Sequence, residues 1–122
     1  MKKSLLLFLS IFLTTQLYAM PFHRIAFFGD SLSDNGNLYQ WLLHIIPKSP
    51  PYFRGRFSNG ETWSEDLGQY YYHRYYISYK IYAVAGATAI YHSPNSRFIS
   101  PSTLSMEIER YFLDALFKNK KD

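Results

Sequence analysis

Apolar residues gather in a few short segments of the chain, and their spacing predicts two strands and three helices. The run at 24–28 ends at Gly29-Asp30-Ser31, as expected of a buried strand that turns sharply where it ends. A second segment, 77–84, is rich in β-branched and aromatic residues, which favours another strand. Predicted helical segments separate the two strands along the chain.

The first two predicted helices lie between these strands. The segment 38–46 is expected to be a short buried helix that starts at Asn35-Gly36-Asn37 and stops before Pro47. A loop over 47–60 follows, since prolines and glycines interrupt it repeatedly. The next helix runs from Thr62 to about Tyr72, and its predicted core-facing stripe consists of Trp63, Leu67 and Tyr70.

The third predicted helix follows a second loop, at 91–103, and Ser102 or Thr103 caps it. Its apolar stripe consists of Leu104, Ile108, Tyr111, Phe112, Ala115 and Leu116. The opposite face carries charges spaced three or four residues apart, a spacing that supports a helix. These predicted outer pairs are Glu107 with Arg110, Arg110 with Asp114, and Asp114 with Lys118.

The N-terminal segment predicts where the protein is located. Residues 1–19 combine two lysines, an apolar run and a final Ala19, a pattern typical of a secretory signal peptide. A membrane anchor is the alternative, although the apolar stretch is short of the roughly 20 residues that a spanning helix needs. We therefore expect a single domain at 20–122, secreted or periplasmic after cleavage near Ala19.

Composition and charge exclude several classes of function. There is no cysteine, so disulfide scaffolds and thiolate chemistry are ruled out. The net charge of +4 falls to +2 once Lys2 and Lys3 leave with the signal peptide. No basic cluster of the nucleic-acid-binding kind is present apart from the terminal Lys118-Asn119-Lys120-Lys121, which is expected to be a solvated end. A calcium loop starting at Ser31 fails, because Leu42 stands where a bidentate Glu is required.

The candidate chemistry lies at the end of the first strand, in the sequence Phe28-Gly29-Asp30-Ser31-Leu32-Ser33-Asp34-Asn35-Gly36-Asn37. A serine at such a corner is exposed at the carboxyl end of a strand, where open α/β sheets bind their ligands. Taken by spacing alone, the same residues also suit a polar loop that satisfies backbone groups and caps the next helix.

This block resembles the first block of the GDSL lipases and esterases, the serine hydrolases also called the SGNH family. The resemblance implies that Ser31 is the nucleophile, and that Gly29, Asp30, Asp34 and Asn37 support it. The segment 51–63, Pro-Tyr-Phe-Arg-Gly-Arg-Phe-Ser-Asn-Gly-Glu-Thr-Trp, is similar to the segment that follows this block in the secreted bacterial lipase branch.

A second block follows the second predicted strand, in Ala85-Gly86-Ala87-Thr88. It resembles the second GDSL block, in which a glycine pair precedes Ala-Thr, but here the first glycine of the pair is Ala85. The resemblance implies that the backbone N–H groups of Ser31 and Gly86 form the oxyanion hole. A glycine there also permits positive φ and close approach of the backbone to a ligand.

The later blocks of the family do not occur in these 122 residues. Neither a Gly-x-Asn-Asp nor an Asp-x-x-His is present, and no Asp stands three residues before any of the four histidines, His23, His44, His73 and His92. A serine without a general base is a poor nucleophile, because its hydroxyl stays protonated. We therefore expect a truncated chain that is inactive by itself.

The resemblance implies the N-terminal portion of a flavodoxin-like three-layer α/β/α SGNH hydrolase fold with an incomplete sheet, in which the strands at 24–28 and 77–84 are parallel neighbours linked by helices. It also implies hydrolysis of lipid or other carboxylic esters, of lipase, phospholipase or lysophospholipase type, with contact to a membrane surface and with no metal or organic cofactor. The alternative is a secreted, non-catalytic protein that binds lipid or glycan through its tyrosines, seven of which lie between Tyr70 and Tyr82 inclusive.

Overall fold

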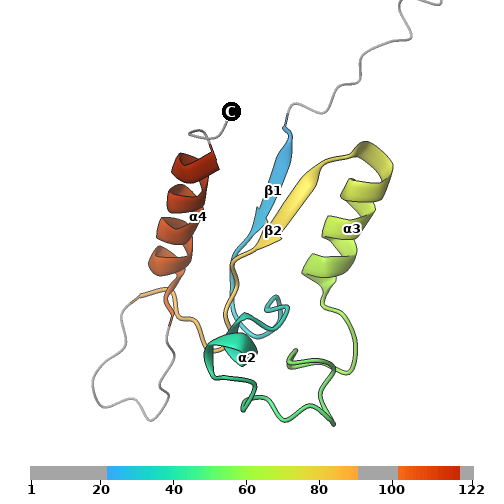
Figure 1. The fold of residues 1–122 in the computed structure, drawn as a ribbon, viewed down its shortest axis with the longest axis vertical. Helices are drawn as coiled ribbons and strands as arrows, with labels where there is room; N and C mark the ends of the chain where they lie inside the picture. The colour runs from blue at the N-terminus through green and yellow to red at the C-terminus, as the bar shows by residue number, and fades with distance from the viewer. Residues whose placement is uncertain (1–21, 91–101, 119–122) are drawn as a thin grey trace, which may run out of the picture.

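The computed structural model describes residues 22–90 and 102–118, whose elements are arranged as Figure 1 shows. Within these residues the elements are, in chain order, β1 (Arg24–Phe27), α2 (Asn37–Trp41), α3 (Trp63–Tyr75), β2 (Ser78–Ile81) and α4 (Leu104–Lys118). The two strands lie between α3 and α4 in Figure 1, so the described part is an α/β unit.

The parts of the chain outside this description include the predicted signal peptide and most of the predicted loop at 91–103. Among the residues that are described, no helix combines the length and the apolar character needed to cross a membrane.

The pairing of β1 with β2 is parallel, as the sequence predicts, and runs from Arg24 opposite Ser78 to Phe27 opposite Ile81. Backbone hydrogen bonds continue beyond the formal strand ends. The N–H of Tyr82 donates to the carbonyl of Phe27 at 2.8 Å. The N–H of Val84 donates to the carbonyl of Gly29 at 3.0 Å. The chain that follows β2 therefore stays hydrogen-bonded to the first block as far as Val84, which stands two residues before Gly86.

The core of the described residues lies on and just beyond the strands. One cluster joins Phe27, Ile81 and Ala83, and a second joins Leu38, Val84 and Ala85. The two clusters together bury both strand ends, so the residues that follow each strand are held in place by packing as well as by backbone hydrogen bonds.

The predicted helix at 38–46 is shorter than expected, since α2 ends at Trp41. Leu43 and His44 have φ values of +52° and +68°, and the His44 N–H donates to the Tyr39 carbonyl at 2.7 Å. This is the hydrogen bond of a Schellman-type end, which stops a helix with left-handed residues. The prediction of a buried helix is also wrong, because of the residues in 38–46 only Leu38 is buried. The loop predicted at 47–60 is irregular, as expected.

Helix α3 begins where predicted, with Thr62 as its N-cap, but it buries a different face. Its buried residues are Ser64, Glu65 and Gly68, whereas Trp63 and Tyr70 are 54% and 55% exposed. The reason is the close approach of β2: a Cβ on Gly68 would overlap the ring of Tyr79. Gly68 therefore permits the close contact with β2, while Trp63 packs edge-on against Phe27 of β1 although its ring is half exposed.

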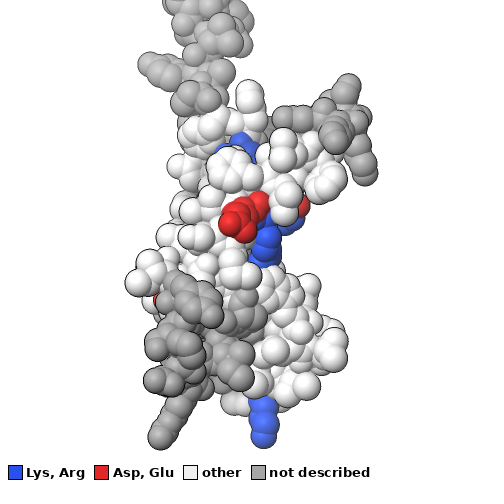
Figure 2. Space-filling model, turned by 90° about the vertical axis from the view of Figure 1, so that its left-hand side faces the viewer, with Lys and Arg blue, Asp and Glu red and all other residues white. Residues whose placement is uncertain are grey.

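Helix α4 also forms where predicted, and Thr103 Oγ1 accepts the N–H of Met106 in its first turn at 3.3 Å. The predicted inward stripe is wrong for Leu104, Ile108, Phe112 and Leu116, which are exposed, whereas its member Tyr111 packs against Phe28 as expected. The polar residues Glu107 and Asp114, each one position before a stripe residue, also meet the chain at or just beyond the strand ends. The side of the molecule on which α4 lies carries few charged side chains (Figure 2).

Two of the residues predicted to form charge pairs on the outer face of α4, Glu107 and Asp114, are placed differently in the structure. Glu107 is fully buried, and Asp114 forms an ion pair with Lys80 of β2. Asp114 also accepts the hydroxyl of Tyr82 at 2.8 Å. Burial and the neighbouring Asp114 carboxylate raise the pKa of the Tyr82 hydroxyl to about 12. Tyr82 therefore stays protonated and keeps donating this hydrogen bond.

Candidate functional site

The first block forms a tight corner directly after β1. Gly29 has a φ of +142°, which side chains rarely adopt, so the sharp turn requires glycine there. The carbonyl of Asp30 accepts the N–H groups of Ser33 and Asp34, both at 3.0 Å, and its carboxylate accepts the N–H of Leu32 at 3.0 Å. Ser31 sits inside this turn and is half-buried.

Asp34 is the central support of the block. Its side chain is fully buried and accepts four backbone N–H groups. Three belong to the start of α2: Gly36 at 2.8 Å, Asn37 at 2.5 Å and Leu38 at 3.1 Å. The fourth is the N–H of Ala85 at 2.7 Å, which ties the first block to the second. Four backbone donors compensate for the removal of this side chain from water.

Asn37 makes a second tie between the two segments. Its Nδ2 donates to the carbonyls of Ile81 and Ala83, at 3.1 Å and 2.8 Å. These carbonyls lie at the end of β2 and just beyond it, and the sheet of the described residues has no third strand that could donate hydrogen bonds to them. Asp34 and Asn37 therefore both bind the chain that leads to Gly86.

The second block forms a turn in which the Ala87 N–H donates to the Val84 carbonyl at 2.9 Å. Gly86 has a φ of +82°, the conformation that the third residue of a type II turn requires. Ala85 occupies the position before it and is buried, without a positive φ. The departure from a glycine pair is thus accommodated, because the residue that needs positive φ is still glycine.

Glu107 belongs to the site although sequence reasoning placed it on an outer face. Its carboxylate accepts the N–H of Gly29 at 2.9 Å and that of Val84 at 3.1 Å. Burial raises the pKa of this carboxyl, and the nearby Asp34 acts in the same direction; the two N–H donors and Arg110 oppose them. No local signal marked Glu107, since its partners lie 78 and 23 residues away.

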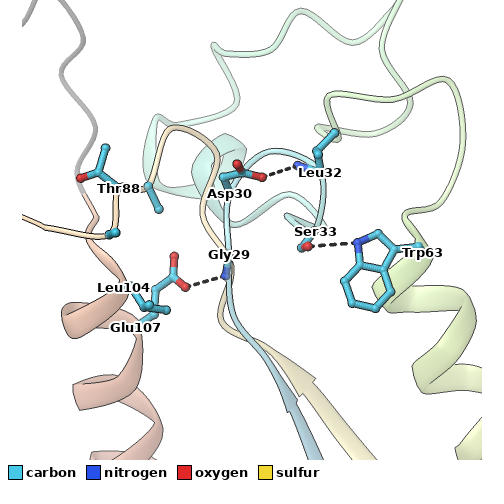
Figure 3. Close-up of a pocket in the computed structure, with 10 residues that line it drawn as sticks. Gly29, Asp30, Leu32, Ser33, Trp63, Thr88, Leu104 and Glu107 are labelled. Atoms are coloured by element: carbon cyan, nitrogen blue, oxygen red, sulfur yellow. Dashed lines mark hydrogen bonds between the residues drawn. The ribbon is translucent and has the colours of Figure 1, made fainter.

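Ser33, Trp63 and Ser64 join α3 to the corner and were likewise not predicted as site residues. Trp63 Nε1 donates to Ser33 Oγ at 3.1 Å, and the Ser64 hydroxyl donates to the Ser33 carbonyl at 2.9 Å. Trp63 was expected in the core, but its half-exposed ring stands at the edge of the site (Figure 3).

A cavity of about 420 Å³ lies at this junction, between the first block, the second block and α4. Figure 3 shows Glu107 bonded to Gly29 on one side of it and Trp63 bonded to Ser33 on the other. Its lining is Gly29, Asp30, Leu32, Ser33, Trp63, Ala87, Thr88, Ala89, Leu104 and Glu107. Ser31 lies between two of the lining residues but is not itself one of them.

The histidines of the described residues do not complete a catalytic pair with Ser31. His23, His44 and His73 are exposed, line no part of this cavity and form no hydrogen bond to the Ser31 hydroxyl. His92 lies outside the described residues. Within the same part of the chain, no group of three or more metal-ligating side chains is assembled.

The geometry defines a class of site: a serine at a strand-to-helix corner, tied by buried side chains to a glycine turn from the neighbouring parallel strand. That is the arrangement expected where a hydroxyl nucleophile and backbone oxyanion donors must be fixed together. No family model matches the chain.

The chain is similar to two particular curated proteins over part of its length. One is a phosphatidylcholine-sterol acyltransferase of Aeromonas hydrophila, 56% identical over 46 residues. Another is the secreted effector protein SseJ of Salmonella typhimurium, 53% identical over 45 residues. The matches cover 38% and 36% of this chain but only 14% and 11% of the relatives. They confirm the resemblance to the N-terminal part of the GDSL-type lipases.

Proposed function

We propose that this chain carries the nucleophile side of a serine-dependent site for lipid esters, with Ser31 as nucleophile. The backbone N–H groups of Ser31 and Gly86 are the proposed oxyanion donors. The observation that carries the proposal is the hydrogen bond that the Ala85 N–H donates to the Asp34 carboxylate, because it joins the serine corner to the glycine turn. Preorganised donors of this kind stabilise the charge that develops during acyl transfer.

The proposed substrate is an acyl ester of a lipid outside the cytoplasm. The Aeromonas relative is named for acyl transfer from phosphatidylcholine to a sterol, and the Salmonella relative is named a secreted effector. Hydrolysis and acyl transfer share an acyl-serine intermediate and differ in whether water or an alcohol accepts the acyl group. Apolar side chains of Leu32, Trp63 and Leu104 line the cavity and suit an acyl chain. The predicted signal peptide at 1–19 supports export.

We also propose that these 122 residues by themselves do not turn over ester. Their sequence contains neither the Asp-x-x-His that would hold a general base nor the Gly-x-Asn-Asp that would add a donor. The full architecture proposed for the site is the flavodoxin-like three-layer sandwich, of which β1, β2 and the flanking helices would form the N-terminal portion.

Ester hydrolysis by the 122-residue chain, measured with a short-chain chromogenic ester, is the first test. We expect the rate to equal that of Ser31→Ala. A Ser31-dependent rate in the isolated chain would overturn the proposed inactivity.

A chimera tests the nucleophile role directly. Residues 22–118 of this chain replace the corresponding segment of the Aeromonas acyltransferase, which supplies the remainder of that enzyme. We expect acyl transfer in the chimera, and a loss on the order of 10⁴- to 10⁶-fold with Ser31→Ala. Ser105→Ala, at an exposed serine of α4, is the matched control. Retention of activity by the Ser31→Ala chimera would exclude Ser31 as nucleophile.

The exposed aromatic end of α3 favours a second candidate function, the binding of lipid or glycan without catalysis. Tyr70, Tyr72 and Tyr75 are about half exposed, and Tyr76 is 88% exposed. Tyrosine rings commonly lie at membrane–water interfaces. Vesicle co-sedimentation of the 122-residue chain separates the two: binding that Tyr76→Ser weakens and Ser31→Ala leaves unchanged, together with an inactive chimera, would support this candidate instead.

A further inference from the structure

Glu107 is a buried acid on a helix whose large apolar neighbours are exposed. Its side chain has no exposure, whereas Met106 and Ile108, on either side of it, are 46% and 36% exposed. Burying a carboxylate is costly unless hydrogen bonds compensate for the lost water. The hydrogen-bond partners of Glu107 show what compensates for its burial, and they indicate a role for this side chain.

The partners are two backbone N–H groups, one from each block of the site. Glu107 Oε2 accepts from Gly29, which stands two residues before Ser31. Glu107 Oε1 accepts from Val84, which stands two residues before Gly86. Val84 shares the same N–H with the Gly29 carbonyl at 3.0 Å. The carboxylate thus closes a ring of hydrogen bonds across the two strand ends.

We propose that Glu107 is a positioning residue, whose carboxylate fixes the separation between the Ser31 corner and the Gly86 turn. The inference rests on the proposed function, since it assigns to Glu107 the alignment of the nucleophile with its oxyanion donor. Val84 is also the residue whose carbonyl closes the turn around Gly86, so an anchor on Val84 orients the Gly86 N–H.

Asp34 does not make this anchor redundant. Asp34 holds the Ala85 N–H and the start of α2, whereas no bond from Asp34 reaches Gly29 or Val84. Glu107 supplies the only side-chain hydrogen bonds to these two N–H groups among the described residues. The two carboxylates therefore fix different sides of the same junction.

The first test needs no enzymatic activity. In ¹⁵N-labelled 122-residue chain, the amide signals of Gly29, Val84 and Gly86 are followed as the pH is changed. We expect all three to shift with one common midpoint, above the ordinary Glu value of 4.5. The other charged groups that face Glu107 are Asp34 and Asp30 from the first block and Arg110 from its own helix. The N–H groups of Gly36 and Ala85 bond to Asp34 and not to Glu107, so their signals serve as the internal reference.

Glu107→Gln assigns the titration, and Glu109→Gln, an exposed acid on the same helix, is the matched control. The common midpoint should vanish in Glu107→Gln and persist in Glu109→Gln. A Gly86 signal that does not follow Gly29 and Val84 in the wild-type chain would overturn the proposal, even if Glu107→Gln fails to fold.

The second test uses the active chimera. We expect Glu107→Gln to lower kcat by about 10- to 100-fold, because small misplacements of reacting groups are that costly. KM should stay within about twofold of the Glu109→Gln control. An unchanged kcat, or a loss matched by a lower folded fraction in circular dichroism, would overturn the positioning role. Failure of the proposed function is seen separately, as activity that survives Ser31→Ala.

Discussion

Asp34 and Glu107 are both buried carboxylates that hold backbone N–H groups at the ends of β1 and β2, but they come from opposite ends of the chain. Asp34 lies inside the first block and accepts mainly from its immediate neighbours, Gly36, Asn37 and Leu38. Glu107 reaches the same junction from α4 and accepts only from distant residues, Gly29 and Val84. The side of the junction that Asp34 holds is therefore built mainly from neighbouring residues, whereas the side that Glu107 holds forms only when distant parts of the chain have come together.

The largest expected effect comes from the local carboxylate. Asp34→Asn places an amide N–H against backbone donors, and each buried donor left unpaired costs about 1–3 kcal/mol. We expect a loss of about 3–5 kcal/mol in the free energy of unfolding, measured by urea titration with circular dichroism. Glu107→Gln should cost less, because two donors are involved and not four.

Asp66→Asn, at an exposed acid of α3, is the control for the Asp34 substitution and should be close to neutral. If Asp34→Asn lost less stability than Glu107→Gln, the ranking of the two carboxylates would be reversed.

An intermediate effect is expected in the pH dependence of stability, where Glu107 behaves oppositely to Glu65 of α3. Burial raises the pKa of Glu107, so the folded state binds more protons and stability falls as pH rises from 4.5 through the folded pKa. Burial also acts to raise the pKa of Glu65, but its hydrogen bonds to Arg56 and Thr62 outweigh burial and lower it. Its contribution is therefore present above 4.5 and is lost as pH falls through the folded pKa.

Urea unfolding between about pH 3 and pH 7 checks both signs, with each unit of pKa difference worth about 1.4 kcal/mol. Glu107→Gln should remove the decline above pH 4.5, and Glu65→Gln should remove the loss on the acid side. If the free energy of unfolding of Glu107→Gln fell with pH as steeply as that of the wild-type chain, the Glu107 carboxylate would not be the source of the decline.

The smallest effect is expected at the surface ion pair between Lys80 and Asp114, which also links α4 to β2. Lys80→Met keeps much of the apolar stem and removes the charge. We expect a loss below about 1 kcal/mol that shrinks at 1 M salt, since exposed pairs are weak and screened. Lys48→Met, at an exposed lysine of the loop, is the control. A loss as large as that of Glu107→Gln would place the main anchor of α4 at the surface.

The same contrast explains what the sequence could predict. Asp34 and Asn37 were expected as supports because the contiguous block that contains them resembles the first GDSL block, and the same resemblance implied that the two strands are parallel neighbours linked by helices. Glu107 was missed because a charge off the apolar stripe ordinarily faces solvent. Its bonds to Gly29 and Val84, together with the charge of Arg110, compensate for its burial, and no spacing along the chain encodes the two bonds.

Both long helices formed where predicted, yet most of the large apolar residues in their predicted stripes are exposed. In α3 it is Gly68 that meets the sheet, since Tyr79 leaves no room for a larger side chain. In α4 the polar Glu107 and Asp114 do so, because their partners are backbone and side-chain donors near the strand ends. Hydrophobic periodicity locates a helix well, but it cannot show that a satisfied polar group or a glycine is the contact.

The continuous register from β2 to the second block limits how the chain can change in length. From Ile81 to Val84 each residue is paired with β1 or the first block, so one inserted residue would displace Gly86 by about 3.3 Å, the rise of a strand. The irregular loop at 47–60 has no such pairing with the strands. Insertions and deletions should accordingly be accepted in that loop and rejected between Ile81 and Gly86.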